Sequence, residues 1–267
     1  MDEKVEEFLR TVAQAPRSVL LLDYDGTLAP FMVTRDQAVP YPGLENLLQR
    51  IVDAGRTRLV MVTGRDAREI GSLLRLRPSP EIWGAHGLQR LRIDGSCEMP
   101  EVPPRVAQTL EDARRWLGYQ GLQHLAENKP GSIAVHWRAL EEAEAAELHG
   151  RILVGWFPIA ERECLKLLEF DGGLEMRMPD LDKGDAVRTV LGELGIGVPV
   201  AYLGDDVTDE HAFRAMGPSG LTVLVRPKYR KTAARVWLRP PEELFDFLNR
   251  WLQATETTPL ARRATHS

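Results

Sequence analysis

The sequence predicts an α/β fold, a doubly wound and mostly parallel sheet with a smaller α+β domain inserted into it. Three short aliphatic runs that end in turn or acidic residues support this prediction: "SVLLLD" at 18–23, "TRLVMVTG" at 57–64 and "VPVAYLGDD" at 198–206. Such runs are typical of strands buried on both faces of a parallel sheet. Helix-like segments separate them, as expected for parallel strands joined by crossover helices.

The first crossover helix lies in "PGLENLLQRIVDAG", where apolar residues recur at helical spacing and Gly55 ends the segment. After the second strand, "RDAREIGSLL" predicts another helix, and "PEIWGAHG" predicts a further short strand. Strand, helix and strand in this order form the repeating unit of a parallel sheet. The first part of the core domain therefore spans residues 1–88.

The middle of the chain changes character. It predicts, in order, hairpin-like strands in "LQRLRIDGSCEM", a helix in "PRVAQTLEDARRWLGY", a strand in "GSIAVHWR", a helix in "LEEAEAAELHGRILVGW" and two strands in "ECLKLLEF" and "GLEMRMP". The turn "FDGG" at 170–173 fits a hairpin between the last two. This mixed order favours a small α+β domain over residues 89–178.

The core domain resumes at residues 179–254. "DKGDAVRTVLGELG" predicts a helix that opens after Leu181, "GLTVLV" predicts a strand, and "PEELFDFLNRWLQ" predicts the closing helix. Residues 255–267 have little to bury, so we expect a disordered tail there.

Composition excludes several classes of protein. The formal net charge of -5 argues against a nucleic-acid binder, which usually carries a basic face. No apolar run approaches the roughly 18 residues that span a bilayer, and the charged N-terminus lacks the apolar stretch of a secretory signal. Cys97 and Cys164 have no metal-ligand spacing and are too few for a disulfide framework. We expect a soluble, cytoplasmic protein, without membrane or nucleic-acid partners, that is a monomer.

Polar residues gather where the predicted parallel strands end, which is where ligands bind in open parallel sheets. The first strand ends in Asp23 and Asp25, and the second in Thr63, Gly64 and Arg65. The late strand brings Asp205 and Asp206, followed one helical turn later by Asp209, and Lys183 starts the helix after the insert. Several carboxylates on one rim repel each other, so a cation is expected among them.

Magnesium fits this rim better than zinc, because the donors are all oxygen atoms. The ion would attract an anion, most plausibly phosphate, whose oxygens Lys183 and Thr63 would hold together with backbone N–H groups near Gly26 and Gly64. Asp23 would then attack phosphorus and form an aspartyl-phosphate. Asp25 would protonate the leaving alcohol and later activate water.

Each of these features is weak by itself. A pair of aspartates such as Asp23 and Asp25 often occurs by chance. Thr63 could be an ordinary hydroxyl residue at the end of a strand, and Lys183 could be a solvent-exposed helix residue. The acidic run "GDDVTDE" is also what a helix N-cap with acids in its first turn would look like. Their joint occurrence in order along one sheet indicates a phosphatase.

The sequence resembles the haloacid dehalogenase superfamily of phosphohydrolases, whose core is Rossmann-like. "DYDGTL" is similar to its first motif, the strand of Thr63 to its second, Lys183 to its third and "GDDVTDE" to its fourth. Within it, "VTGRD", "GAHGLQR", "ENKPGSIAVHWR", "LEMRMPDLDKGDAV" and "YLGDDVTDEHAF" resemble segments of trehalose-6-phosphate phosphatases. The resemblance covers roughly residues 17–252. That family often has Ser at the position of Thr63.

This resemblance implies a phosphatase that releases phosphate from trehalose 6-phosphate in the final step of trehalose biosynthesis. Asp23 would be the nucleophile and Asp25 the acid/base, with Mg²⁺ on Asp23, the backbone carbonyl of Asp25 and Asp205. Asp206 and Asp209 would support the metal, and the insert would be a cap over the sugar. The implied substrate-binding residues are Gly64, Arg65, His86, Gly87, Glu127, Lys129, His136, Arg138 and Glu175.

Alternatives remain open at this point. Sucrose-phosphate and mannosyl-3-phosphoglycerate phosphatases share this core, and only the cap separates them; Glu127 and Lys129 before "HWR" favour trehalose 6-phosphate. His136 and Arg138 would share one face of a strand, although Arg138 with Glu127 could equally form a surface ion pair and His136 could simply be packed. A receiver-like signalling module that accepts phosphate is the non-enzyme alternative.

Overall fold

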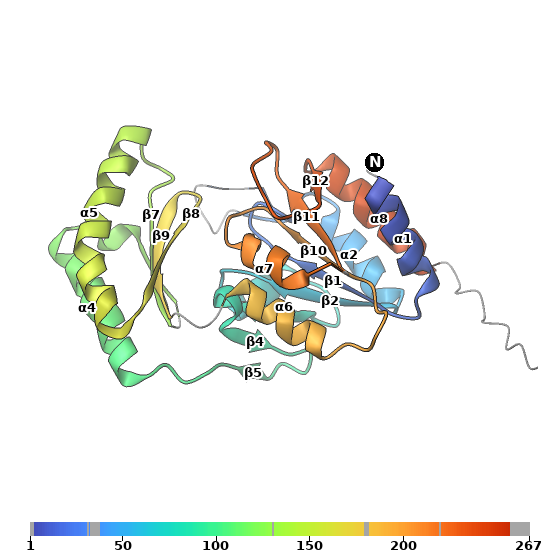
Figure 1. The fold of residues 1–267 in the computed structure, drawn as a ribbon, viewed down its shortest axis with the longest axis horizontal. Coiled ribbons are helices and arrows are strands. Elements are labelled where there is room, and N and C mark those ends of the chain that lie inside the picture. The colour runs from blue at the N-terminus through green and yellow to red at the C-terminus, as the bar shows by residue number, and fades with distance from the viewer. Residues whose placement is uncertain are drawn as a thin grey trace, which may run out of the picture.

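The computed structural model describes residues 3–30, 32, 38–129, 131–178, 182–218 and 220–256. Their strands form an eight-stranded sheet in the order β12-β11-β10-β1-β2-β3-β4-β5 and a four-stranded sheet in the order β6-β7-β9-β8. Figure 1 shows the two sheets in separate lobes, with helices on both faces of the larger sheet. The predicted doubly wound α/β fold is confirmed. Among the described residues, no helix is both long and apolar enough to cross a membrane.

The larger sheet is parallel from β12 to β3 and turns antiparallel at β4 and β5. Its elements, with their helices, are α1 (Glu3–Gln14), β1 (Ser18–Leu22), α2 (Leu44–Asp53), β2 (Thr57–Val62), α3 (Ala67–Leu73), β3 (Glu81–Gly84), the 3₁₀ helix η2 (Ala85–Gly87), β4 (Gln89–Leu91), β5 (Cys97–Glu98), α6 (Lys183–Gly192), β10 (Val200–Gly204), α7 (Asp209–Met216), β11 (Leu221–Val225), β12 (Val236–Leu238) and α8 (Glu242–Glu256).

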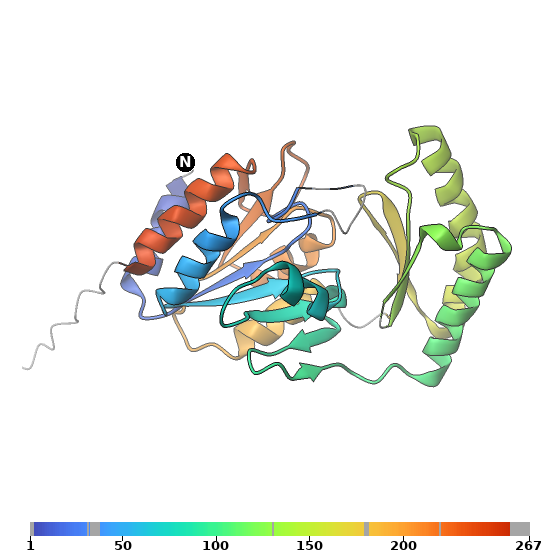
Figure 2. The same ribbon diagram turned by 180° about the vertical axis from the view of Figure 1, so that it is seen from behind.

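The smaller sheet is antiparallel and carries two long helices on its outer face (Figures 1 and 2). Its lobe consists of α4 (Pro104–Tyr119), the 3₁₀ helix η3 (Gln123–Leu125), β6 (Ala126–Lys129), β7 (Ser132–His136), α5 (Glu142–Ala160), the 3₁₀ helix η4 (Glu161–Glu163), β8 (Lys166–Phe170) and β9 (Gly173–Arg177). We call this lobe the cap, and we propose that it is the inserted domain.

Three details of the sequence prediction are corrected. Residues 89–98 were expected in the insert, but β4 pairs with β3 and so extends the larger sheet. The strand before Arg138 ends at His136, so the two residues do not share a strand face. Helix α8 continues to Glu256 and so includes the first two residues of the expected tail, and residues 257–267 lie outside the described residues.

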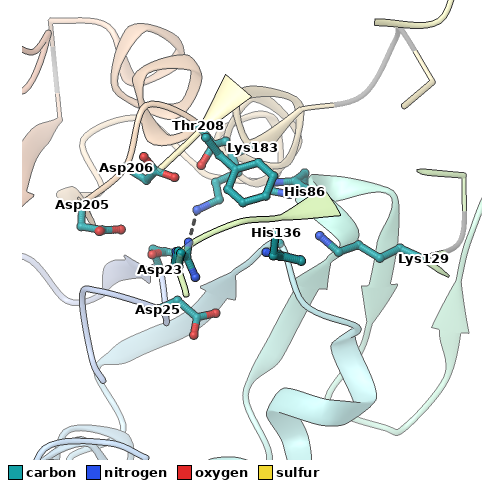
Figure 3. Close-up of a pocket in the computed structure, with 12 residues that line it drawn as sticks. Asp23, Asp25, His86, Lys129, His136, Lys183, Asp205, Asp206 and Thr208 are labelled. Carbon is teal, nitrogen blue, oxygen red and sulfur yellow. Dashed lines mark hydrogen bonds and ion pairs between the residues drawn. The ribbon is translucent and has the colours of Figure 1, made fainter. Parts of the chain in front are cut away.

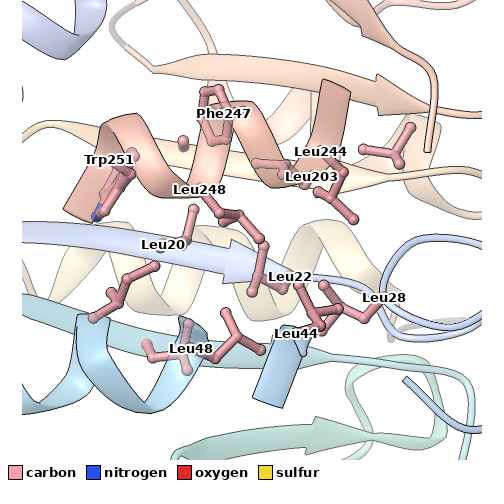
Figure 4. Close-up of a cluster of buried hydrophobic side chains, with 14 of the residues drawn as sticks. Leu20, Leu22, Leu28, Leu44, Leu48, Leu203, Leu244, Phe247, Leu248 and Trp251 are labelled. Carbon is pink, nitrogen blue, oxygen red and sulfur yellow. The ribbon is translucent and has the colours of Figure 1, made fainter. Parts of the chain in front are cut away.

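The core lobe has a hydrophobic layer on each face of the larger sheet. Along β1, Leu20 and Leu22 belong to the cluster under α1, α2 and α8, whereas Val19 and Leu21 belong to the cluster under α6 and α7. Figure 4 shows the first cluster, where leucines of β1 meet Phe247 and other side chains of α8. Strand β1 is therefore buried on both faces and fixed at the centre of the sheet.

The cap has a hydrophobic cluster of its own, built from α4, α5 and the outer face of its sheet, with Trp156 fully buried in it. Its members lie between Val102 and Met178, so the described hydrophobic clusters do not run from one lobe into the other. Each lobe thus buries its apolar side chains separately.

A buried ion-pair network ties the edge of the core sheet to helix α6. Glu81 accepts hydrogen bonds from Arg58 (2.5 Å), Arg90 (2.8 Å) and the indole of Trp83 (2.9 Å). Both arginines also pair with Glu193, just after α6, at 2.6 and 2.7 Å. Since Glu81 is 5% exposed, its charge depends on these partners rather than on water.

We expect Glu81→Gln to lower the free energy of unfolding by about 3–5 kcal/mol, because a buried network loses the charge that its arginines require. Urea denaturation measures this loss. Glu98→Gln is the matched control, since Glu98 forms an exposed pair with Arg92 on the neighbouring strand and should change stability by about 1 kcal/mol or less. Equal effects of the two substitutions would contradict the structural role of the network.

Candidate active site

The carboxyl ends of β1 and β10 bring the site together. These strands are parallel neighbours with Leu22 opposite Leu203, so the residues that follow them meet on one rim. One carboxylate oxygen from each of Asp23, Asp205 and Asp209 lies within 4.8 Å of the others. Figure 3 shows Asp23, Asp205 and Asp206 around the ammonium of Lys183.

Lys183 is held in this cluster by the start of α6. The carboxylate of Asp182 caps the helix by accepting from the N–H of Gly184 (2.7 Å), which makes Lys183 the first helical residue. Its ammonium donates to Asp23 and to Asp209, each at 2.7 Å. Burial alone would lower the pKa of Lys183, but the charges of Asp209 and Asp23 outweigh it and raise the pKa.

Asp23 is almost fully buried at the end of β1. Lys183 donates to its Oδ1, and the hydroxyl of Thr27 lies 3.3 Å from its Oδ2. Burial raises the pKa of Asp23 to about 7, although the charge of Lys183 opposes this shift. A buried carboxylate with a raised pKa requires positive charge nearby to stay ionised.

Asp209 acts as a brace beneath the site. Its Oδ1 accepts from Lys183 and from the hydroxyl of Tyr202 (2.7 Å), and its Oδ2 accepts from the backbone N–H groups of Asp205 (3.0 Å) and Asp206 (2.9 Å). Both oxygens are occupied, and the side chain is fully buried. This geometry fits the expected supporting role and disfavours Asp209 as a direct metal ligand.

Asp205 is the carboxylate that most requires a cation. Its Oδ1 is buried and has no hydrogen-bond partner among the described residues. Burial, with the charges of Asp23 and Asp206, raises its pKa well above the usual value. An unpartnered carboxylate oxygen facing a second carboxylate fits a hard divalent ion such as Mg²⁺, which binds oxygen ligands.

Asp25 is held by a buried arginine. Arg65 is fully buried and donates through Nε and Nη2 to the two oxygens of Asp25, at 2.7 and 2.6 Å. It also pairs with Glu69. Direct sugar contact was expected for Arg65, but the structure aims its guanidinium at Asp25, so we revise that expectation to a positioning role. The hydroxyl of Thr63, also buried, accepts from the backbone N–H of Arg65 (3.1 Å).

A cavity between the core and the cap opens over these groups. The cavity has a volume of about 70 Å³ and is partly open to solvent. It is lined by Asp23, Asp25, Gly64, His86, Lys129, His136, Arg138, Phe170, Lys183, Asp205, Asp206 and Thr208. The lining does not include six further residues that were expected in the site: Thr63, Arg65, Gly87, Glu127, Glu175 and Asp209.

Phe170 and Thr208 line the cavity but were missed in the sequence. Thr208 lies inside the acidic run that follows β10, so its neighbours were a signal. Phe170 ends β8, and its ring meets that of His136 edge-on at 5.2 Å between centroids. An aromatic residue before a hairpin turn does not by itself indicate a wall of a binding site.

His86 crosses from the core to the cap. Its Nε2 lies 3.2 Å from Glu175 of β9, and burial lowers the pKa of His86 well below the usual value. Gly64 makes room for this ring, because a Cβ at that position would lie 2.5 Å from Cε1 of His86. The segments "VTGRD" and "GAHGLQR" can therefore pack closely because Gly64 has no side chain.

Two acidic residues hold the basic face of the cap. Lys129 lies between Glu175 (3.4 Å) and Glu127 (3.7 Å), and Glu127 also contacts Nε2 of His136 at 2.8 Å. Burial would raise the pKa of Glu175, but the charges of Lys129, His86 and Arg177 and a hydrogen bond from Ser132 bring it below the usual value. Lys129 and His136 are thereby presented to the cavity.

The chain is similar in sequence and in fold to known proteins. A trehalose-phosphate phosphatase of Mycobacterium marinum is 30% identical over 252 residues, covering 88% of this chain and 61% of the relative, so the chain spans about three fifths of that protein's length. The C-terminal domain of C. albicans trehalose-6-phosphate phosphatase has a TM-score of 0.77 at 18% identity and covers 95% of this chain and 97% of its own.

The fold extends beyond these relatives. A haloacid dehalogenase-like hydrolase from Bacteroides thetaiotaomicron has a TM-score of 0.60 at 17% identity, covering 88% of this chain and 99% of its own. This chain and that hydrolase therefore share a fold. A sequence profile of the trehalose-phosphatase family matches residues 21–238, a range that includes both lobes. The chain belongs to the trehalose-phosphatase family.

Proposed function

We propose that the chain is a Mg²⁺-dependent phosphatase that hydrolyses trehalose 6-phosphate to trehalose and phosphate through an aspartyl-phosphate on Asp23. The observation that carries the proposal is the buried cluster of Asp23, Lys183 and Asp205 beneath a cavity whose other wall is the cap. Family membership supports the same chemistry. A receiver-like module accepts phosphate on its core domain and needs no cavity that a second domain encloses.

In the first step an oxygen of Asp23 attacks phosphorus, and the bond from phosphorus to the sugar oxygen breaks. The leaving oxygen takes a proton from Asp25, which Arg65 holds at the rim of the cavity. In the second step Asp25 takes a proton from water while the water oxygen attacks phosphorus and releases Asp23. Lys183 offsets negative charge on the phosphoryl group throughout.

The metal site proposed here uses Asp23, Asp205 and the backbone carbonyl of Asp25. Bound Mg²⁺ would neutralise the carboxylates and withdraw charge from the phosphate oxygens. Arg230 steadies the loop that carries the ligand Asp205, since it donates to the backbone carbonyls of Asp205 (3.1 Å) and Asp206 (2.6 Å). The loop is therefore fixed through its backbone, and Oδ1 of Asp205, which has no hydrogen-bond partner among the described residues, is available to the ion.

The cap supplies the proposed sugar contacts. Lys129, His136 and Arg138 reach the cavity from the face opposite Asp23, and polar side chains of this kind suit the hydroxyls of a disaccharide. Because they lie across the cavity from the phosphate-binding cluster, they would select the sugar without taking part in phosphoryl transfer. Sucrose 6-phosphate and mannosyl-3-phosphoglycerate are the competing substrates of this proposal.

Asp23→Asn should abolish phosphate release, by about 10³-fold or more in kcat, because an amide cannot form the aspartyl-phosphate. The fold should persist and its thermal stability should hold or rise, since one charge leaves a crowded buried cluster. Phosphate release and thermal unfolding measure the two effects. Asp53→Asn, an exposed change on α2, is the control with normal activity. Wild-type turnover by Asp23→Asn would refute the nucleophile.

Mg²⁺ at a hundredfold excess over its dissociation constant should raise the melting temperature by about 5–10 °C, because the ion binds only the folded cluster. Asp205→Asn should lose most of this shift, whereas Asp53→Asn should keep it. Thermal melts after treatment with a chelator, with and without added Mg²⁺, measure the difference. A full shift in the Asp205 variant would exclude that residue as a ligand.

Trehalose 6-phosphate should be preferred about a hundredfold in kcat/KM over sucrose 6-phosphate, mannosyl-3-phosphoglycerate and glucose 6-phosphate, about 2.7 kcal/mol in transition-state binding. Lys129→Met should reduce this preference and leave p-nitrophenyl phosphate hydrolysis unchanged, because that substrate has no sugar. Lys228→Met, at an exposed lysine of the core, is the control. Similar slow rates on all four sugar phosphates would support a phosphatase but contradict trehalose 6-phosphate as its preferred substrate.

A further inference from the structure

A cap turn and a core arginine meet beside the metal-binding loop. We propose that Asp171 and Arg226 form a latch that holds the cap closed over the cavity, and that both are positioning residues for sugar phosphates. The part that concerns sugar phosphates rests on the proposed function, whereas the latch itself rests on geometry. Neither residue lines the cavity.

Asp171 lies at the tip of the hairpin formed by β8 and β9. The turn is fixed on the cap side, because Nε of Arg138 donates to the carbonyl of Asp171 (2.8 Å) and the N–H of Trp137 donates to the carbonyl of Gly172 (2.9 Å). Gly172 has φ +81°, a conformation that favours glycine. The tip and the segment that carries Arg138 therefore move as one piece.

On the core side the same tip contacts the loop of Asp205 and Asp206. Nη2 of Arg226 lies 2.6 Å from Oδ2 of Asp171, and Nη1 lies 3.5 Å from the backbone carbonyl of Asp205. The N–H of Asp171 points to Oδ2 of Asp206 at 3.4 Å. One guanidinium thus bridges the cap tip and the loop that supplies the proposed metal ligand.

Arg226 is anchored for this task. It directly follows β11, its N–H donates to the carbonyl of Leu238 (3.0 Å), and its carbonyl accepts from the indole of Trp237 (2.8 Å). Burial would lower the pKa of Arg226, but Asp171, Asp205 and Asp206 outweigh it and raise the pKa. These hydrogen bonds fix the backbone of Arg226 to β12, so in this proposal the latch opens by movement of the cap.

The latch controls one wall of the cavity and leaves the other in place. Arg138 and Phe170 both line the cavity. Phe170 directly precedes Asp171 in the sequence, and Arg138 donates to the carbonyl of Asp171. The guanidinium carbon of Arg138 lies 5.9 Å from the centroid of the Phe170 ring. If the tip swings away, these two side chains leave the sugar, whereas Asp23 and Lys183 remain paired within the core. Substrates that fill the cap side should therefore depend on the latch more than small ones do.

An exposed ion pair alone shifts an equilibrium little, so the expected effect is moderate: about a threefold to tenfold rise in KM for trehalose 6-phosphate in Asp171→Asn. The kcat and KM for p-nitrophenyl phosphate should not change in this variant. Arg239→Gln, which removes an exposed arginine paired with Glu243 on the same end of the core, should match the wild type with both substrates. A parallel loss with both substrates would overturn the positioning role.

A distance measurement tests the latch without turnover. Nitroxide labels at Glu169→Cys and Lys228→Cys, two residues from each latch partner, are introduced with the exposed Cys97 and Cys164 changed to Ser. Asp171→Asn and Arg226→Gln should each add a longer inter-label distance, and the double variant should open the cap no further than either single change. Arg239→Gln should keep the parent distribution.

Unchanged distances in both latch variants would overturn the proposal, and so would additive opening in the double variant. If the wild type hydrolyses p-nitrophenyl phosphate but none of the sugar phosphates, the proposed function fails while the distances still decide the latch. The two failures are therefore distinguishable.

Discussion

The contact between the ammonium of Lys183 and the carboxylates of Asp23 and Asp209 holds the active site together. Asp23 and Asp205 follow adjacent parallel strands, so the topology of the sheet itself forces carboxylates into one buried place. Buried like charges would drive the rim apart, and the lysine offsets part of this repulsion. Oδ1 of Asp205 has no hydrogen-bond partner among the described residues, and we propose that a metal ion offsets the remaining repulsion. The helix cap at Asp182, which fixes Lys183, is thus as important to the site as the carboxylates.

The core fold was predictable because the informative residues lie at strand and helix ends, and the same residues carry the prediction of the site. Aliphatic runs locate the strands, the rule for parallel sheets brings their ends together, and acidic residues there indicate a metal. Asp209 accepts four hydrogen bonds among the described residues, and its role in supporting a metal stays a prediction. Helix α1 was overlooked, although Val5, Leu9 and Val12 follow helical spacing and are buried.

Contacts between distant segments were not predictable from local pattern. The turn in "LQRLRIDGSCEM" indicates a hairpin, but nothing in it says that β4 joins β3 rather than the cap sheet. Arg65 was expected to face the sugar because the resemblance places it in the site. A buried guanidinium needs carboxylate partners nearby, and Arg65 pairs with Asp25 and Glu69. The bridge from Asp171 to Arg226 joins residues 55 apart in sequence, which no periodicity reveals.

The separate hydrophobic clusters of the two lobes have an evolutionary consequence. Since the described apolar cores do not merge, a substitution inside the cap cluster can reshape the cap sheet without disturbing the packing beneath Asp23 and Lys183. The contacts described across the cavity are polar, such as that of His86 with Glu175, and polar pairs can be exchanged one at a time. If the proposed function holds, substrate preference can therefore drift among descendants of such a protein while the residues proposed for phosphoryl transfer are kept.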